Sequence, residues 1–221
     1  ALIDGLLTFS NDNSLVPTVN GNFDLILNAT NDAAYLYDFG QGAPLSSLTL
    51  NGEGDLHMIS RPVIQGASGL SILGDWKWNW TSADPFSFTT NNQDLNLSGV
   101  SLNAAGEIKF DTGSGSLSLG EIGSDGTATE LIINSAGVLN LHGDITLTDS
   151  KLGFDFSNVN SVVLHEDMTF GSLDSLVRVN FGNVGIDGTY ALTIFSDDIH
   201  LGEIGSNIAL QELNIYSQAD L

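Results

Sequence analysis

Apolar and polar side chains alternate at every second position over many short stretches of the chain, and this pattern predicts β-strands. The alternation is clearest in LSL at 117–119, LNL at 139–141, ITL at 145–147 and FDF at 154–156. A period of two residues is typical of a strand that buries one face and exposes the other. Gly, Asn and Asp separate these stretches about every 8–12 residues. We therefore expect many short strands joined by turns, with almost no helix.

The pentapeptide LGEIG occurs twice, at 119–123 and at 201–205, and the residues around it recur as well. A divergent upstream copy brings Gly40 into line with Gly123 and Gly205, at separations of 83 and 82 residues. The copies of this unit span approximately 34–115, 116–197 and, incompletely, 198–221. Repeats of a fixed period indicate a stacked architecture.

A parallel β-helix explains the repeat, whereas a β-sandwich gives no reason for one. At about 20 residues per coil, each unit would hold about four coils, and residues 1–221 would form one continuous solenoid of roughly ten to eleven coils. Gly40, Gly123 and Gly205 would take positive φ at structural turns, where other residues are strained. The side chains expected to point into the core are Leu119, Ile122, Leu131, Ile133, Leu139, Leu141, Leu201, Ile204, Leu213 and Ile215.

Composition and charge narrow the function. Hydrophobic residues make up 42% of the 221 residues, enough for a core. The chain carries 27 acidic and 5 basic residues, for a net charge of −22. This balance argues against nucleic acid and anionic membranes as partners, because both require basic patches. The absence of cysteine excludes disulfides and thiolate metal sites, and no apolar run is long enough for membrane insertion.

Three segments in series resemble the repeats of large bacterial surface adhesins of the filamentous-haemagglutinin-like kind. They are VLNLHGDITLTD from Val138, VNFGNVGIDGTYALTI from Val179 and LGEIGSNIALQELNI from Leu201. The resemblance is close over 117–221 and loose over 18–58. It implies a right-handed parallel β-helix, export across an outer membrane to the cell surface, and a stalk or adhesive role. It carries over no catalytic residues.

Acidic residues raise the question of a metal. Asp38, Glu121 and Glu203 share one column of the repeat, but four coils would place them about 19 Å apart, too far to share an ion. We interpret them as outward-facing acids beside turn glycines. No segment has the spacing of a calcium loop or of a calcium-binding nonapeptide repeat. The sequence therefore predicts no cofactor, although the acid pairs at 166–167 and 197–198 leave calcium open.

The best binding candidate is WKWNW, in which Trp76, Trp78 and Trp80 lie on one face of a strand. If that face is exposed, it offers an aromatic strip to sugar rings or to a protein partner. Alignment with ITLTD instead places Trp76 and Trp78 on the apolar positions Ile145 and Leu147, which favours a role in the core. Trp80 aligns with a polar residue and is the one most expected to be exposed.

No catalytic constellation is visible. The four histidines, among them His142 and His165, share no column of the repeat and lack the spacing of a metal site. There is no G-x-S-x-G motif, and none of the five basic residues adjoins a recurrent acidic cluster. We therefore expect that the chain is not an enzyme.

These observations predict a non-enzymatic, structural or adhesive segment of a secreted bacterial surface adhesin or biofilm matrix protein. It would act as a rigid rod whose partners are surface glycans or proteins, or other copies of itself. The main alternative is a subunit of an extracellular filament that stacks through open solenoid ends. A polysaccharide-degrading β-helix enzyme is less favoured. Neither end of the sequence reads as a capping coil, so either a longer repeat protein or other copies would have to cover the ends.

Overall fold

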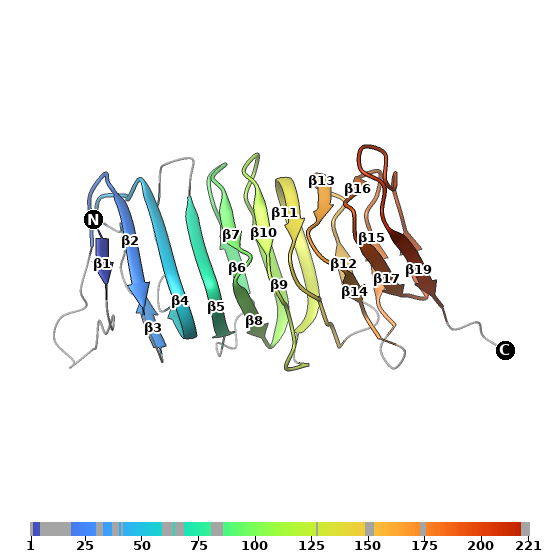
Figure 1. Ribbon diagram of the computed structural model, residues 1–221, viewed down its shortest axis with the longest axis horizontal. Helices are drawn as coiled ribbons and strands as arrows, with labels where there is room; N and C mark the ends of the chain where they lie inside the picture. The colour runs from blue at the N-terminus through green and yellow to red at the C-terminus, as the bar shows by residue number, and fades with distance from the viewer. Residues whose placement is uncertain are drawn as a thin grey trace.

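The computed structural model describes residues 2–4, 19–29, 33–36, 40, 42–58, 64, 69–80, 86–126, 128–148, 153–172 and 176–217. These residues form an all-β structure without a helix. Every pairing between their strands is parallel. Figure 1 shows the strands stacked along one long axis, with β1 near one end and β19 near the other. The predicted parallel β-solenoid is confirmed, and its right-handedness stays a prediction.

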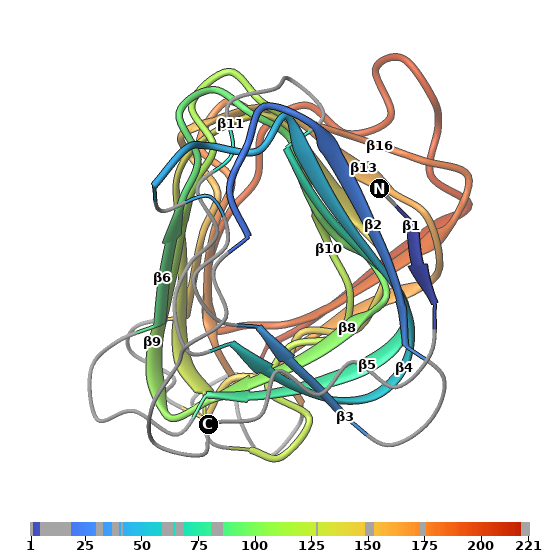
Figure 2. The same cartoon turned by 90° about the vertical axis from the view of Figure 1, so that its left-hand side faces the viewer.

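The strands form three faces around a roughly triangular cross-section (Figure 2). The first face contains β1 (Leu2–Asp4), β2 (Asp24–Ala29), β7 (Leu95–Leu97), β10 (Leu117–Leu119), β13 (Val159–Leu164), β16 (Gly185–Asp187) and parts of the long strands β4 (Ser47–Met58), β5 (Leu70–Trp80) and β11 (Ala128–Leu141). The second face contains the ends of β4 and β5 with β3 (Ala33–Leu36), β8 (Val100–Ala104), β14 (Met168–Phe170), β17 (Ala191–Phe195) and β19 (Glu212–Tyr216). The third face contains the start of β11 with β6 (Phe86–Thr89), β9 (Gly106–Asp111), β12 (Gly153–Asp155), β15 (Arg178–Asn180) and β18 (Asp198–His200).

The register along the first face gives the length of a coil. One inward column consists of Leu25, Leu48, Leu70, Leu95, Leu117, Leu139, Val162 and Ile186, each paired with the next. Successive members lie 22 to 25 residues apart, so this stretch makes about seven turns. The expectation of ten to eleven coils of about 20 residues is therefore wrong, because three strands and three turns need a longer coil.

The two LGEIG segments make the same kind of bridge at different corners of the cross-section. Ile122 forms a parallel bridge with Leu102 of the second face, whereas Ile204 forms one with Ile186 of the first face. Their 82-residue spacing is thus not a whole number of coils, and the expected four-coil correspondence is wrong. The shared pentapeptide specifies a turn that fits more than one corner.

The aligned glycines explain this turn. Gly40, Gly123 and Gly205 have φ of 73°, 72° and 65°, a region that side chains other than glycine rarely adopt. A Cβ atom at Gly123 would also collide with the carbonyl oxygen of Thr146 in the next coil. Glycine is therefore required here both by the backbone conformation and by the close approach of the neighbouring coil.

The buried hydrophobic residues form a single cluster along the solenoid. The predicted inward residues that are at most 1% exposed are Leu119, Ile122, Leu131, Ile133, Leu139 and Leu141. Leu201 and Ile204 are partly buried against the same core. Alternation of apolar and polar residues thus predicted the core side of these strands correctly.

Leu213 and Ile215 of β19 depart from this pattern, with 37% and 45% of their surface exposed. They pair in register with Leu192 and Ile194 of β17, which are fully buried. The two residues therefore continue an inward column, as predicted. They are exposed because no described coil covers their other side.

Candidate functional site

The tryptophan strip lies mostly in the core. Trp76 and Trp78 are 0% and 2% exposed, and Trp80 is partly buried. The ring of Trp78 meets Phe86 edge to face at 5.0 Å between centroids, and Trp80 meets the same phenylalanine at 5.4 Å. The interpretation of Trp76 and Trp78 as an exposed binding strip is therefore corrected, because buried rings cannot contact a ligand. They fill the interior where the second and third faces meet.

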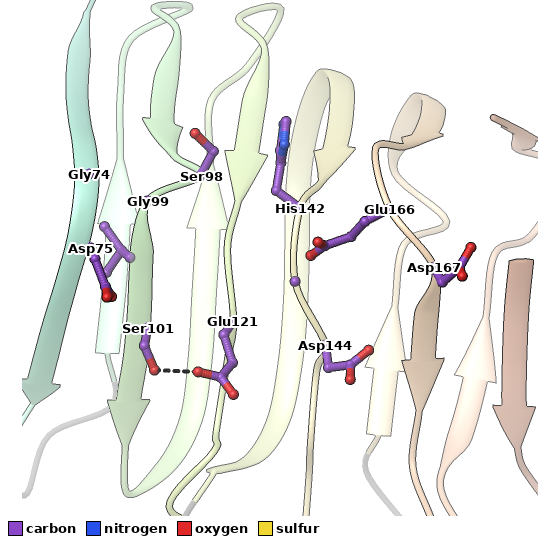
Figure 3. A pocket seen from close by; sticks show the side chains of 12 residues that line it. Gly74, Asp75, Ser98, Gly99, Ser101, Glu121, His142, Asp144, Glu166 and Asp167 are labelled. Atoms are coloured by element: carbon purple, nitrogen blue, oxygen red, sulfur yellow. Dashed lines mark hydrogen bonds between the residues drawn. The ribbon is translucent and has the colours of Figure 1, made fainter. Parts of the chain in front are cut away.

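A groove runs along the corner between the first and second faces and encloses about 390 Å³. Figure 3 shows that its side chains come from consecutive coils. The lining residues that carry ionisable groups are Asp75, Glu121, His142, Asp144, Glu166 and Asp167. Gly74, Gly99 and Gly143 lie between them, so backbone forms much of the groove floor.

The carboxylates of the groove bind polar groups of adjacent coils. Glu121 accepts a hydrogen bond from the Ser101 hydroxyl at 2.8 Å (Figure 3), and Asp144 accepts one from the backbone N–H of Thr169 at 2.8 Å. Asp167 in turn accepts one from the backbone N–H of Ala191 at 2.9 Å. These bonds join one coil to the next, so the acids have a structural role in addition to any role toward a ligand.

Charge repulsion within the groove shifts one pKa. Partial desolvation, together with the nearby carboxylates of Asp144 and Asp167, raises the pKa of Glu166 above its ordinary value. Such a shift is a property that general acids share. Here like charges and partial burial account for it without any catalytic role.

Two histidines stack beside this groove. The rings of His142 and His165 lie 4.1 Å apart and nearly parallel, and His165 Nε2 forms a hydrogen bond with Asn140 Oδ1 at 3.0 Å. Burial and the neighbouring His165 lower the pKa of His142. The two residues occupy neighbouring coils, so the expectation that they share no column is corrected.

A second acidic cluster lies on the third face. Glu107 and Glu130 are register partners, and Lys109 forms an ion pair with Glu107 at 2.8 Å. Partial burial and the Glu107 carboxylate raise the pKa of Glu130. Lys109 therefore does adjoin an acidic cluster, contrary to the sequence-based expectation.

The remaining acids of the sequence analysis do not gather. Glu203 lies at a different corner from Glu121, while Asp38 lies outside the described residues. Asp198 forms an ion pair with Arg178 at 3.4 Å. Within the described ranges, no three His, Asp or Glu side chains converge on a point that could hold a metal ion. Calcium thus gains no support from this part of the chain.

Sequence analysis missed the groove because its members are one coil apart. Glu121, Asp144 and Asp167 are spaced by 23 residues, as are His142 and His165, and Glu107 and Glu130. The signal was therefore a recurrence of polar types at the coil length, which the search at 82 residues could not detect.

Comparison with protein-family models, with curated proteins and with solved structures gave no match. The resemblance to adhesin repeats consequently stays a prediction. Among the described residues there is also no helix that could span a membrane.

Replacing Glu166 by glutamine is expected to stabilise the fold at pH 7. A carboxyl whose pKa is raised by folding holds its proton more tightly in the folded state, so stability falls as pH rises through that pKa. The variant should lose its advantage as pH is lowered toward 4.5, the ordinary value for glutamate. Urea unfolding at several pH values measures this difference.

Glu212→Gln is the matched control, since it changes the net charge equally on β19, outside the groove. A gain at pH 7 that is equal in both variants would show that overall charge, rather than repulsion in the groove, is responsible.

Proposed function

We propose that this chain is a non-enzymatic rod segment of a secreted bacterial surface adhesin or biofilm matrix protein. The observation that supports the proposal is the uninterrupted inward column from Leu25 to Ile186, paired coil by coil. In such a stack each coil contacts only its neighbours, and length can be extended without a change of fold. Rigid spacing of binding surfaces is the task that this architecture suits best.

The distribution of charge agrees with a structural role. The groove acids bind hydrogen-bond donors of adjacent coils, and no described residues form a metal centre. The acidic surface opposes close approach of other polyanions. Under this proposal, the extracellular location follows the resemblance to adhesin repeats.

Electron microscopy and scattering of the purified chain test the proposal together with polysaccharide cleavage assays. We expect monomeric rods and no reducing ends released from neutral or acidic polysaccharides. Turnover that disappears when Glu130 or Glu166 is replaced by glutamine would establish an enzyme instead.

The alternative of a filament subunit rests on the exposed inward column of β19. Leu213 and Ile215 present apolar side chains on which a further coil could stack. If long filaments form, Ile215→Glu should disperse them, because it places a charge in that column. Asn214→Glu, which adds the same charge at the next position of the strand, should leave them intact.

A further inference from the structure

Charge is unevenly distributed over the three faces. The outer side of the third face carries Glu107, Lys109, Glu130, Asp155 and Arg178. The outer side of the first face has, along its middle, an in-register column without any charge. It consists of Thr49, Ser71, Asn96, Ser118 and Asn140, each paired with the next. On a chain of net charge −22, an uncharged central column across five consecutive coils is a distinct surface.

The polar groups of this neutral column are largely available. Within the described part of the chain, the hydroxyl groups of Thr49, Ser71 and Ser118 make no hydrogen bond to another residue. Asn96 uses its Oδ1 to accept from the backbone N–H of Ser98, and Asn140 uses its Oδ1 toward His165. Both asparagines therefore keep their amide NH₂ groups, so each coil offers one unused donor.

The geometry of the sheet puts these donors in a row. Neighbouring parallel strands lie about 4.8 Å apart, so the five groups follow the solenoid axis at that spacing. A linear polymer lying along the axis could bond to the column at every coil. Weak contacts of about 0.5–1.5 kcal/mol each then combine through multivalency.

We propose that the neutral column binds an uncharged, hydroxyl-rich polysaccharide aligned with the solenoid axis. The proposal deepens, and rests on, the adhesive role proposed above. Polyanions are repelled by the net charge, and polycations would favour the acidic groove and the third face. Protein partners usually need aromatic or arginine anchors, which this column lacks. Pairing of two copies through this face would bring their acidic grooves toward one another.

The test is co-sedimentation of the full chain with two uncharged polymers, cellulose and an insoluble β-1,3-glucan. Retention should change little with ionic strength, because the contacts are not between charges. Ser118→Glu places a carboxylate in the centre of the column and should weaken retention by about tenfold or more, since the charge would be desolvated without a partner. Ser118→Thr keeps the hydroxyl and should retain binding.

Ser87→Glu provides the matched control, because it adds the same charge on the outer side of the third face, opposite Lys109. It should bind as well as the unchanged chain. Failure to bind either polymer, or equal loss in Ser118→Glu and Ser87→Glu, would overturn the proposal. So would dimers in sedimentation that Ser118→Glu dissociates, because the face would then pair copies. A monomeric rod without cleavage activity but also without polysaccharide binding would leave the rod function standing and refute this inference alone.

Discussion

Replacement of Trp78 by alanine is expected to lower the free energy of unfolding by about 3–5 kcal/mol, the usual loss for a large aromatic residue in a core. The side chain is 2% exposed and meets Phe86 and Phe88 edge to face, with centroids at 5.0 and 6.4 Å. Its removal would leave a cavity that the rigidly stacked strands on either side cannot close. Urea unfolding followed by circular dichroism measures the change.

Trp80→Ala is the comparison, because Trp80 lies on the same strand and contacts the same Phe86 while being only partly buried. It should cost less than half as much. Equal small losses in both variants, together with reduced binding to a sugar or protein, would restore the interpretation of WKWNW as an exposed strip.

Local pattern was sufficient to predict the strands and their inward sides. Leu139 and Leu141 are buried because a polar residue separates two apolar ones, and that information lies within three residues of sequence. The fold class followed from the repeat. The coil length did not, because the same LGEIG turn serves two different corners, and similarity alone does not distinguish the corners.

The groove and the neutral column depend on the register between coils, which local pattern does not contain. Glu121 and Asp144 become neighbours only when Ile122 pairs with Ile145. Turns of variable length make the coil step range from 22 to 25 residues, so no fixed spacing marks these columns in the sequence. The alignment of the tryptophans shifted for the same reason, since Trp78 rather than Trp76 shares the inward column of Ile145.

Replacing Gly123 by alanine is expected to destabilise the fold by about 2–4 kcal/mol. Part of this loss is the strain of a side chain at φ of 72°, which amounts to about 1–2 kcal/mol. The rest is a collision between the new Cβ atom and the Thr146 carbonyl oxygen. That carbonyl belongs to the next coil, so relief would require the two coils to separate.

Gly126→Ala isolates the second contribution. Gly126 lies in the same turn and has the same φ of 72°, yet a Cβ atom there would come no closer than 4.0 Å to the Thr148 methyl group. Both variants therefore carry the backbone strain, and only Gly123→Ala carries the collision. Urea unfolding of the two should separate them by at least about 1 kcal/mol. Equal losses would mean that the coils can move apart at this corner, and that backbone conformation alone accounts for glycine in LGEIG.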